Sequence, residues 1–120
     1  MREERLRATA GLRQALPLSS WRGLSGRRYV VGIHALADLD PADVTEAVII
    51  AVERSGDGSA RVVDIATAGP KPRRSRARWM ARLRDRGATE LHVHRLAETD
   101  EERRAIVADL RDEAGLSSPS

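Results

Sequence analysis

The chain contains no cysteine and no phenylalanine, and it has only one tyrosine and two tryptophans. The missing cysteines exclude disulfides, thiolate nucleophiles and cysteine-ligated metal centres. With so few aromatic residues, the core must consist mainly of valine, isoleucine, leucine and alanine. Such a core is attainable, because a single domain of 120 residues is expected to bury roughly two-thirds of the surface of its unfolded chain.

Long apolar segments are also missing. No window approaches the roughly 18 uncharged apolar residues that a membrane-spanning helix needs. The N-terminal sequence has a charged start but lacks the continuous apolar segment of a secretory signal. The absence of cysteine is compatible with a reducing compartment. We therefore expect a cytoplasmic protein with no membrane partner.

Arginine supplies almost all of the positive charge. Twenty of the 21 basic residues are arginine, Lys71 being the exception, and asparagine is absent. This composition is typical of a GC-rich, bacterial-like genome. Since the net charge is only +3 at pH 7, the abundance of arginine does not by itself indicate nucleic-acid binding. The distribution of charge along the chain is more informative.

The most apolar stretch, Val48–Thr67, is the centre of the predicted fold. Two β-branched runs flank Ser55–Ser59, a turn sequence with two glycines, and this pattern predicts a β-hairpin. The runs show little polar alternation, which is typical of strands covered on both faces. Every other element needs this hairpin to bury its own apolar side chains.

The remaining segments predict one domain. We expect an N-terminal helical arm and connector at 1–26, a single α/β domain at 27–115 and a disordered tail at 116–120. Within this chain, apolar periodicity, proline positions and helix-capping signals predict the other elements. Helices are predicted over 2–16, 40–47, 73–86 and 100–114, and strands over 28–36 and 90–96.

Together these elements predict an α/β fold of the α+β type, a two-layer sandwich with a mainly antiparallel, four-stranded sheet. Each long helix carries one apolar stripe, so we expect both helices to pack on one face of the sheet. The other face would need a second cover, either the N-terminal arm or another copy of the chain. A homodimer is therefore predicted.

A His-x-His pair occurs on the last predicted strand. His92 and His94 are two residues apart, so their side chains point to the same face, beside Glu90. Such a pair can supply two ligands to zinc, with His34 on another strand as a third. This pattern indicates a possible metal-dependent enzyme. Histidines at this spacing are also common as polar residues on a half-exposed strand.

The strongest local bias is the basic run Lys71–Arg86. A helical projection places five of its arginines away from the apolar stripe formed by Trp79, Met80 and Leu83, with Asp85 as the one acid among them. Guanidinium groups on one helix face suit phosphate contacts. The scarcity of aromatic residues counts against extensive base stacking. The candidate contact residues are Arg73, Arg74, Arg78, Arg82 and Arg84.

The sequence thus favours a small binding or regulatory module without enzymatic activity. Its predicted partner is nucleic acid or another polyanion, such as an acidic protein, on the arginine-rich helix. Two alternatives stay open: a metal-dependent enzyme built on the three histidines, and a homodimer whose role is protein–protein interaction. Apart from zinc in the first of these alternatives, no cofactor is indicated.

Overall fold

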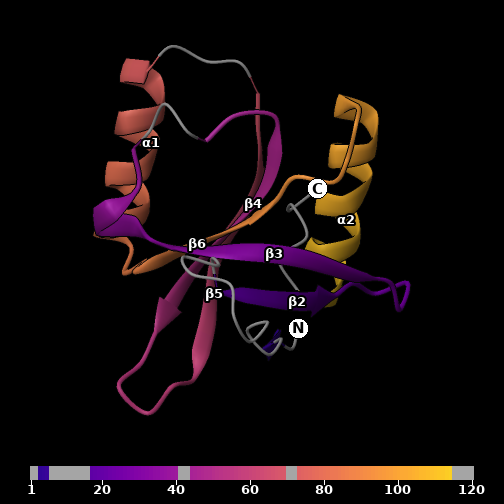
Figure 1. Cartoon of the computed structure of the whole chain (residues 1–120), viewed down its shortest axis with the longest axis horizontal. Helices are drawn as coiled ribbons and strands as arrows, with labels where there is room; N and C mark the ends of the chain where they lie inside the picture. The colour runs from indigo at the N-terminus through magenta and orange to yellow at the C-terminus, as the bar shows by residue number, and fades with distance from the viewer. Residues whose placement is uncertain (1–2, 6–16, 41–43, 70–72, 115–120) are drawn as a thin grey trace, which may run out of the picture.

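The structure is a computed structural model that describes residues 3–5, 17–40, 44–69 and 73–114. It confirms an α+β architecture, with one open antiparallel sheet and two long helices (Figure 1). The strands are β1 (Glu3–Arg5), β2 (Leu18–Arg22), β3 (Arg28–Ala35), β4 (Ala47–Arg54), β5 (Ala60–Ala68) and β6 (Glu90–His94). The helices are α1 (Arg73–Asp85) and α2 (Asp100–Ala114), and a short 3-10 helix, Leu36–Asp38, follows β3.

The sheet has six strands in the order β1-β2-β3-β6-β4-β5, with every neighbouring pair antiparallel. The prediction of four strands is therefore wrong. The additional strands, β1 and β2, arise before residue 27 and belong to the same sheet as the rest of the chain. The sequence of β2, Leu-Ser-Ser-Trp-Arg, has no regular apolar alternation, although Ser19, Ser20 and Trp21 are all buried in the folded chain.

The prediction of an N-terminal helical arm is wrong where the structure describes that segment. Residues Glu3–Arg5 form a strand that pairs with β2, and Glu3 makes an ion pair with Arg54 of β4 at 2.9 Å. Residues 6–16 lie outside the described part of the chain, as does the predicted tail at 116–120. The ion pair between Glu3 and Arg54 joins segments 51 residues apart, and the periodicity of apolar residues along a helix gives no information about such a tertiary contact.

The helix predicted over 40–47 is also wrong where it can be compared. Residues 41–43 lie outside the described ranges, residues 44–46 are not helical, and Ala47 begins β4. Glu46 has a φ angle of 48°, in the left-handed region that an α-helix does not use. The central strand therefore begins at Ala47, where the sequence predicted the end of a helix.

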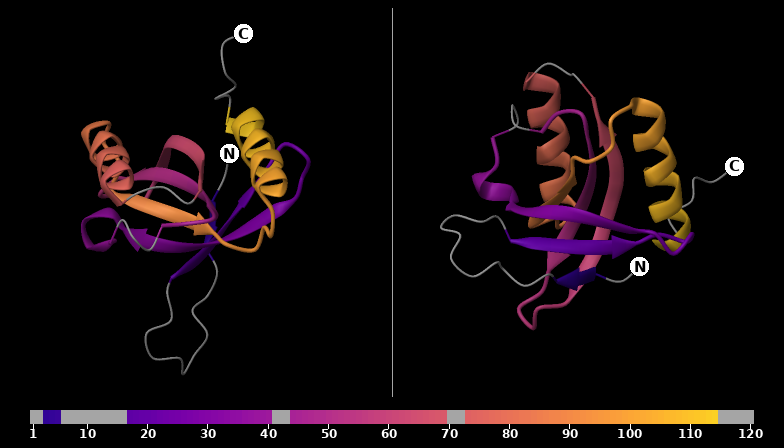
Figure 2. Two further views of the ribbon diagram at one scale, coloured as in Figure 1. Left: turned by 90° about the horizontal axis from the view of Figure 1, so that it is seen from above. Right: turned by 45° about the vertical axis from the view of Figure 1, so that its right-hand side comes forward.

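The two long helices lie on opposite faces of the β4–β5 hairpin, which passes between them (Figures 1 and 2). Ile49 belongs to the apolar cluster under α1, together with Leu83. Ile50 belongs to the cluster under α2, together with Leu110. The prediction that both helices share one face is therefore wrong. An apolar stripe shows that a helix covers a surface but does not identify which face it covers.

This arrangement removes the physical reason for expecting a homodimer. All residues from Ala47 to Val52 are buried within a single chain, because α2 covers the face for which the sequence predicted a second copy. Dimerisation itself stays a prediction. Within the described ranges, α1 and α2 are too short and too charged to act as membrane-spanning helices.

Candidate functional site

The orientation of α1 is set by its apolar side chains and by its C-terminus. Met80 and Leu83 are buried against the sheet, and Trp79 is half-buried beside them. Gly87 ends the helix in the left-handed conformation, with φ of 100°. The Ala88 amide then donates to the Leu83 carbonyl at 3.0 Å, as in a Schellman cap. Most of the other α1 side chains are therefore directed to solvent.

Four of the five predicted contact residues are exposed on α1 and are hereafter called the arginine row: Arg74, Arg78 and Arg82 follow one another at four-residue spacing, and Arg84 lies further round the helix. Within the described residues, none of these four side chains has a hydrogen-bond or ion-pair partner. Arg73 is the first residue of α1, and its side chain lies outside the description. The row is therefore a set of guanidinium groups available to an external anion.

Charge is strongly separated between the two faces of the molecule. Residues 73–86 contain seven arginines and one aspartate, a formal charge of +6. Because the whole chain carries +3, the remainder carries −3. Helix α2 on the other side of the hairpin has six acidic and three basic residues. An anionic partner is therefore attracted to the α1 face and not to the α2 face.

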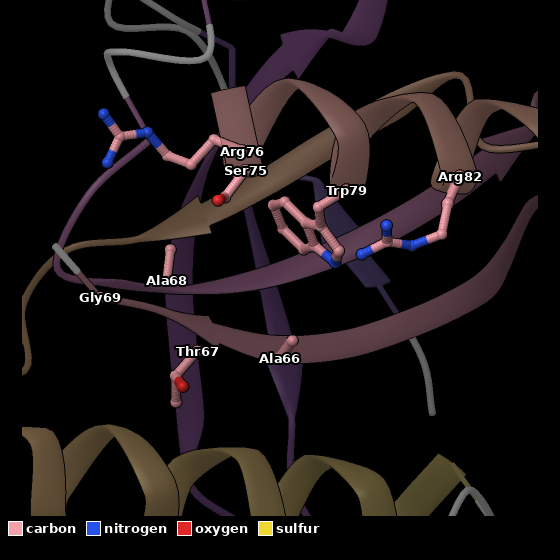
Figure 3. Close-up of a pocket in the computed structure, with 8 residues that line it drawn as sticks. All are labelled: Ala66, Thr67, Ala68, Gly69, Ser75, Arg76, Trp79 and Arg82. Carbon is pink, nitrogen blue, oxygen red and sulfur yellow. The ribbon is translucent and has the colours of Figure 1, made fainter. Parts of the chain in front are cut away.

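A pocket of about 190 Å³ lies between the arginine row and the end of β5. We call it the Trp79 pocket. It is lined on the strand side by Ala66–Gly69 and on the helix side by Ser75, Arg76, Trp79 and Arg82. Figure 3 shows the Trp79 indole at the centre, with the Arg82 guanidinium turned toward it and Arg76 extending away at the other end. The Nε atom of Arg76 is buried and has no hydrogen-bond partner among the described residues. The pocket therefore combines an aromatic ring with the positive charge of Arg82 at one end.

Two further arginines, which the sequence did not predict as a pair, contact the backbone in the middle of β5. Arg86 donates to the Val63 carbonyl at 3.0 Å, and Arg111 donates to the Ile65 carbonyl at 3.0 Å. Both also approach the carboxylate of Asp64. These side chains cover the open edge of the sheet at residues 63–65. The one sequence signal was Asp64, which interrupts an apolar strand.

The three histidines considered as zinc ligands do not lie together. His92 is paired with Ile33, and His34 with Leu91, on adjacent antiparallel strands. Directly paired residues share a face and successive residues alternate, so His34 lies on the face opposite to His92 and His94. No group of three histidine, aspartate or glutamate residues in the described part of the chain could hold a metal ion.

His92 instead forms the centre of a buried polar network. The Trp21 indole N–H donates to His92 Nδ1 at 2.9 Å, so Nδ1 must carry a lone pair. The proton is then on Nε2, which donates to Glu90 at 2.8 Å. Arg54 donates to both Glu90 and Glu3, which lie on either side of the ring. His92 is fully buried, so its ring is not accessible to a substrate.

The pKa values of this network favour neutral His92 between negative carboxylates. Burial lowers the pKa of His92 below its usual 6.5, although both glutamates oppose this. Burial alone would raise the pKa of Glu3 and of Glu90, but the hydrogen bonds from Arg54, together with a second hydrogen bond to each carboxylate and the nearby charges, outweigh burial and lower the pKa of each below 4.5. Contacts with both carboxylates raise the pKa of the Arg54 guanidinium.

These shifts predict that the protein loses stability in acid. His92 binds a proton less readily in the folded protein than in the unfolded chain. Its neutral form therefore contributes to the free energy of unfolding above the unfolded pKa of about 6.5, and this contribution is lost as the pH falls below that value. We expect His92→Gln, which can retain both hydrogen bonds, to flatten the dependence of the unfolding free energy on pH between 7.5 and 5.5. Urea denaturation at several pH values measures this, and an unchanged slope would assign the acid sensitivity to other groups.

A larger but more open depression of about 530 Å³ lies beside α2. Two acidic residues, Glu102 and Asp109, line it, and Asp109 already accepts hydrogen bonds from the Ser25 backbone, the Ser25 hydroxyl and the Tyr29 hydroxyl, all at 2.7–2.8 Å. Burial raises the pKa of Asp109, but these hydrogen bonds outweigh burial and lower it overall. Asp109 thus anchors the β2–β3 turn to α2 and is not free to act on a ligand.

Comparison of the chain with protein families, curated proteins and solved structures found no match. The function must therefore be argued from geometry. Of the three arrangements described above, the histidine network is internally paired around a fully buried His92, and Asp109 is satisfied by hydrogen bonds within the chain. The arginine row with the adjoining Trp79 pocket is the surface that is both exposed and chemically unsatisfied.

Proposed function

We propose that the protein is a small non-enzymatic binding module that holds nucleic-acid phosphates on the arginine row of α1. The observation that carries this proposal is the row itself: four exposed guanidinium groups without partners among the described residues, in a segment, 73–86, whose formal charge is +6. Arginine donates to phosphate oxygens through a planar fork, which favours phosphate as the recognised group.

The spacing of the arginine row also suits a repeating anion. Arg74, Arg78 and Arg82 are each four residues apart, which is about 6 Å along a helix axis. Successive phosphates of one B-form strand are about 3.4 Å apart along the axis, so each arginine interval corresponds to roughly two nucleotides. A regular polyanion can therefore contact several members of the row at once.

The metal-dependent alternative receives no support from the geometry, because His34 is separated from His92 and His94 by the sheet. The acidic α2 further limits the proposal to one surface. Nucleic acid is expected to approach the α1 side, with the β2–β3 turn and α2 facing away from it (Figure 1).

A triple substitution tests this function. We expect Arg74/Arg78/Arg82→Ala to weaken binding of a fluorescent 12-nucleotide strand by about tenfold or more at about 50 mM salt, since phosphate contacts dominate such affinities. Fluorescence anisotropy measures the change. The three positions are exposed, so the fold should be retained, and circular dichroism checks this.

The matched control is Arg27/Arg28/Arg104→Ala, which removes the same formal charge from exposed positions on β3, its preceding turn and α2. It should change the affinity by less than about threefold if binding is confined to α1. Equal losses in the two triple variants would show that net charge alone, and not the arginine row, attracts the strand.

A further inference from the structure

The Trp79 pocket adds a feature that phosphate binding does not require. It is continuous with the arginine row, because Arg82 belongs to both. Its volume of about 190 Å³ is below the roughly 300–1,000 Å³ of pockets for drug-sized ligands, so it suits one small planar group. The half-buried Trp79 indole supplies an aromatic surface at its centre (Figure 3).

The strand side of the Trp79 pocket offers a hydrogen-bond donor and acceptor from the backbone. Ile65 directs its amide and carbonyl away from β4, since the amide donates to Asp64 and the carbonyl accepts from Arg111. Outward-facing residues alternate along an antiparallel edge strand. Thr67, paired with Val48 two positions further along the ladder, therefore also directs its amide and carbonyl outward, at the pocket.

We infer that the Trp79 pocket takes one unstacked nucleobase of a single-stranded nucleic acid. The base stacks on Trp79, its edge pairs with the Thr67 backbone, and the flanking phosphates lie on Arg82 and the rest of the arginine row. This inference rests on the proposed function and makes it specific: the module prefers single strands to duplexes. One aromatic surface provides for one base only.

Two observations favour a nucleobase over an extended acidic peptide. A peptide that adds a strand to a sheet needs a run of free backbone groups along the edge. On β5 this run is interrupted at residues 63–65 by Arg86, Asp64 and Arg111, which leaves only the short segment Ala66–Gly69. A base inside a duplex cannot reach the pocket without leaving its stack, so a single strand is the accessible form.

The test compares three fluorescent probes of equal length: a 12-nucleotide thymidine strand, a 12-unit abasic strand with the same phosphates, and a 12-base-pair duplex. Wild-type protein is expected to bind the thymidine strand about tenfold more tightly than the abasic strand, because stacking of one base contributes a gain of this order. Trp79→Leu keeps an apolar side chain but removes the aromatic face. This variant should bind both strands equally and leave the duplex affinity unchanged.

Thr67→Pro is a second variant, for the case in which Trp79→Leu does not fold. Proline is tolerated on an edge strand where the amide faces outward, and it removes the donor proposed to pair with the base. It should reduce binding of the thymidine strand by about threefold or more and leave binding of the abasic strand unchanged. Circular dichroism confirms the fold of each variant.

The outcomes separate the two proposals. Equal binding of the thymidine and abasic strands by wild-type protein, or a preference that survives both substitutions, would overturn the nucleobase pocket while leaving the arginine row intact. Failure of wild-type protein to bind any of the three probes would overturn the proposed function itself. Competition by thymidine monophosphate as strong as that by the strand would show that the pocket takes a free nucleotide, which also contradicts the inference.

Discussion

Replacement of Arg54 by methionine is expected to lower the free energy of unfolding by about 3–5 kcal/mol at pH 7.5, the cost typical of removing one partner from a buried ion pair. The Arg54 side chain is only 15% exposed and lies between Glu3 and Glu90, which are 8% and 17% exposed. Without the guanidinium, two carboxylates would face neutral His92 with no cation between them. Urea denaturation measures the loss.

This destabilisation should shrink as the pH falls toward 4, because protonation of the two glutamates removes the uncompensated charge. The matched control is Arg61→Met, which breaks an ion pair with Glu53 of similar length, 3.0 Å, at exposed side chains. Exposed pairs of this kind contribute about 0–1 kcal/mol. Equal losses in the two variants would show that the Arg54 network is no more than a surface ion pair.

The second large effect concerns the two helices. Leu83→Ala on α1 and Leu110→Ala on α2 are each expected to lower the free energy of unfolding by about 2–5 kcal/mol, because both side chains are fully buried and truncation leaves a cavity. The two leucines belong to separate apolar clusters on opposite faces of β4. Thermal and urea denaturation measure each loss.

Ile49 and Ile50 provide a matched pair that tests this placement. They are adjacent in the sequence and equally buried, but Ile49 faces α1 and Ile50 faces α2. Combined with Leu110→Ala, Ile50→Val should show a coupling energy of about 0.5 kcal/mol or more, whereas Ile49→Val should be additive. The reverse pattern would contradict the assignment of α2 to the Ile50 face.

Much of the fold was predictable because several segments carry strong local signals. The hairpin around Ser55–Ser59, the helix beginning at Arg73 and the helix beginning at Asp100 lie where periodicity, turn residues and capping residues predict them. Local signals do not record which face of a sheet a helix covers. The placement of α2 depends on Leu110 and Ile50 meeting across 60 residues of chain, and this contact has no sequence signature.

The candidate site was predictable in part for the same reason. Charge clustering indicated the arginine row, and the structure leaves Arg74, Arg78, Arg82 and Arg84 exposed. The Trp79 pocket was not predicted, because it depends on how the end of β5 lies beside α1. Trp79 itself was assigned to the apolar stripe, which is correct for its buried side but omits the part that reaches the pocket.

The salt dependence of binding tests the central claim most directly. For a single strand, the logarithm of the binding constant falls with the logarithm of salt concentration with a slope of about −0.7 per phosphate contacted. The four members of the arginine row predict a slope near −3 for wild-type protein, and the single remaining member, Arg84, predicts a slope shallower than −1 for Arg74/Arg78/Arg82→Ala. The same slope in both proteins would contradict phosphate binding by the arginine row.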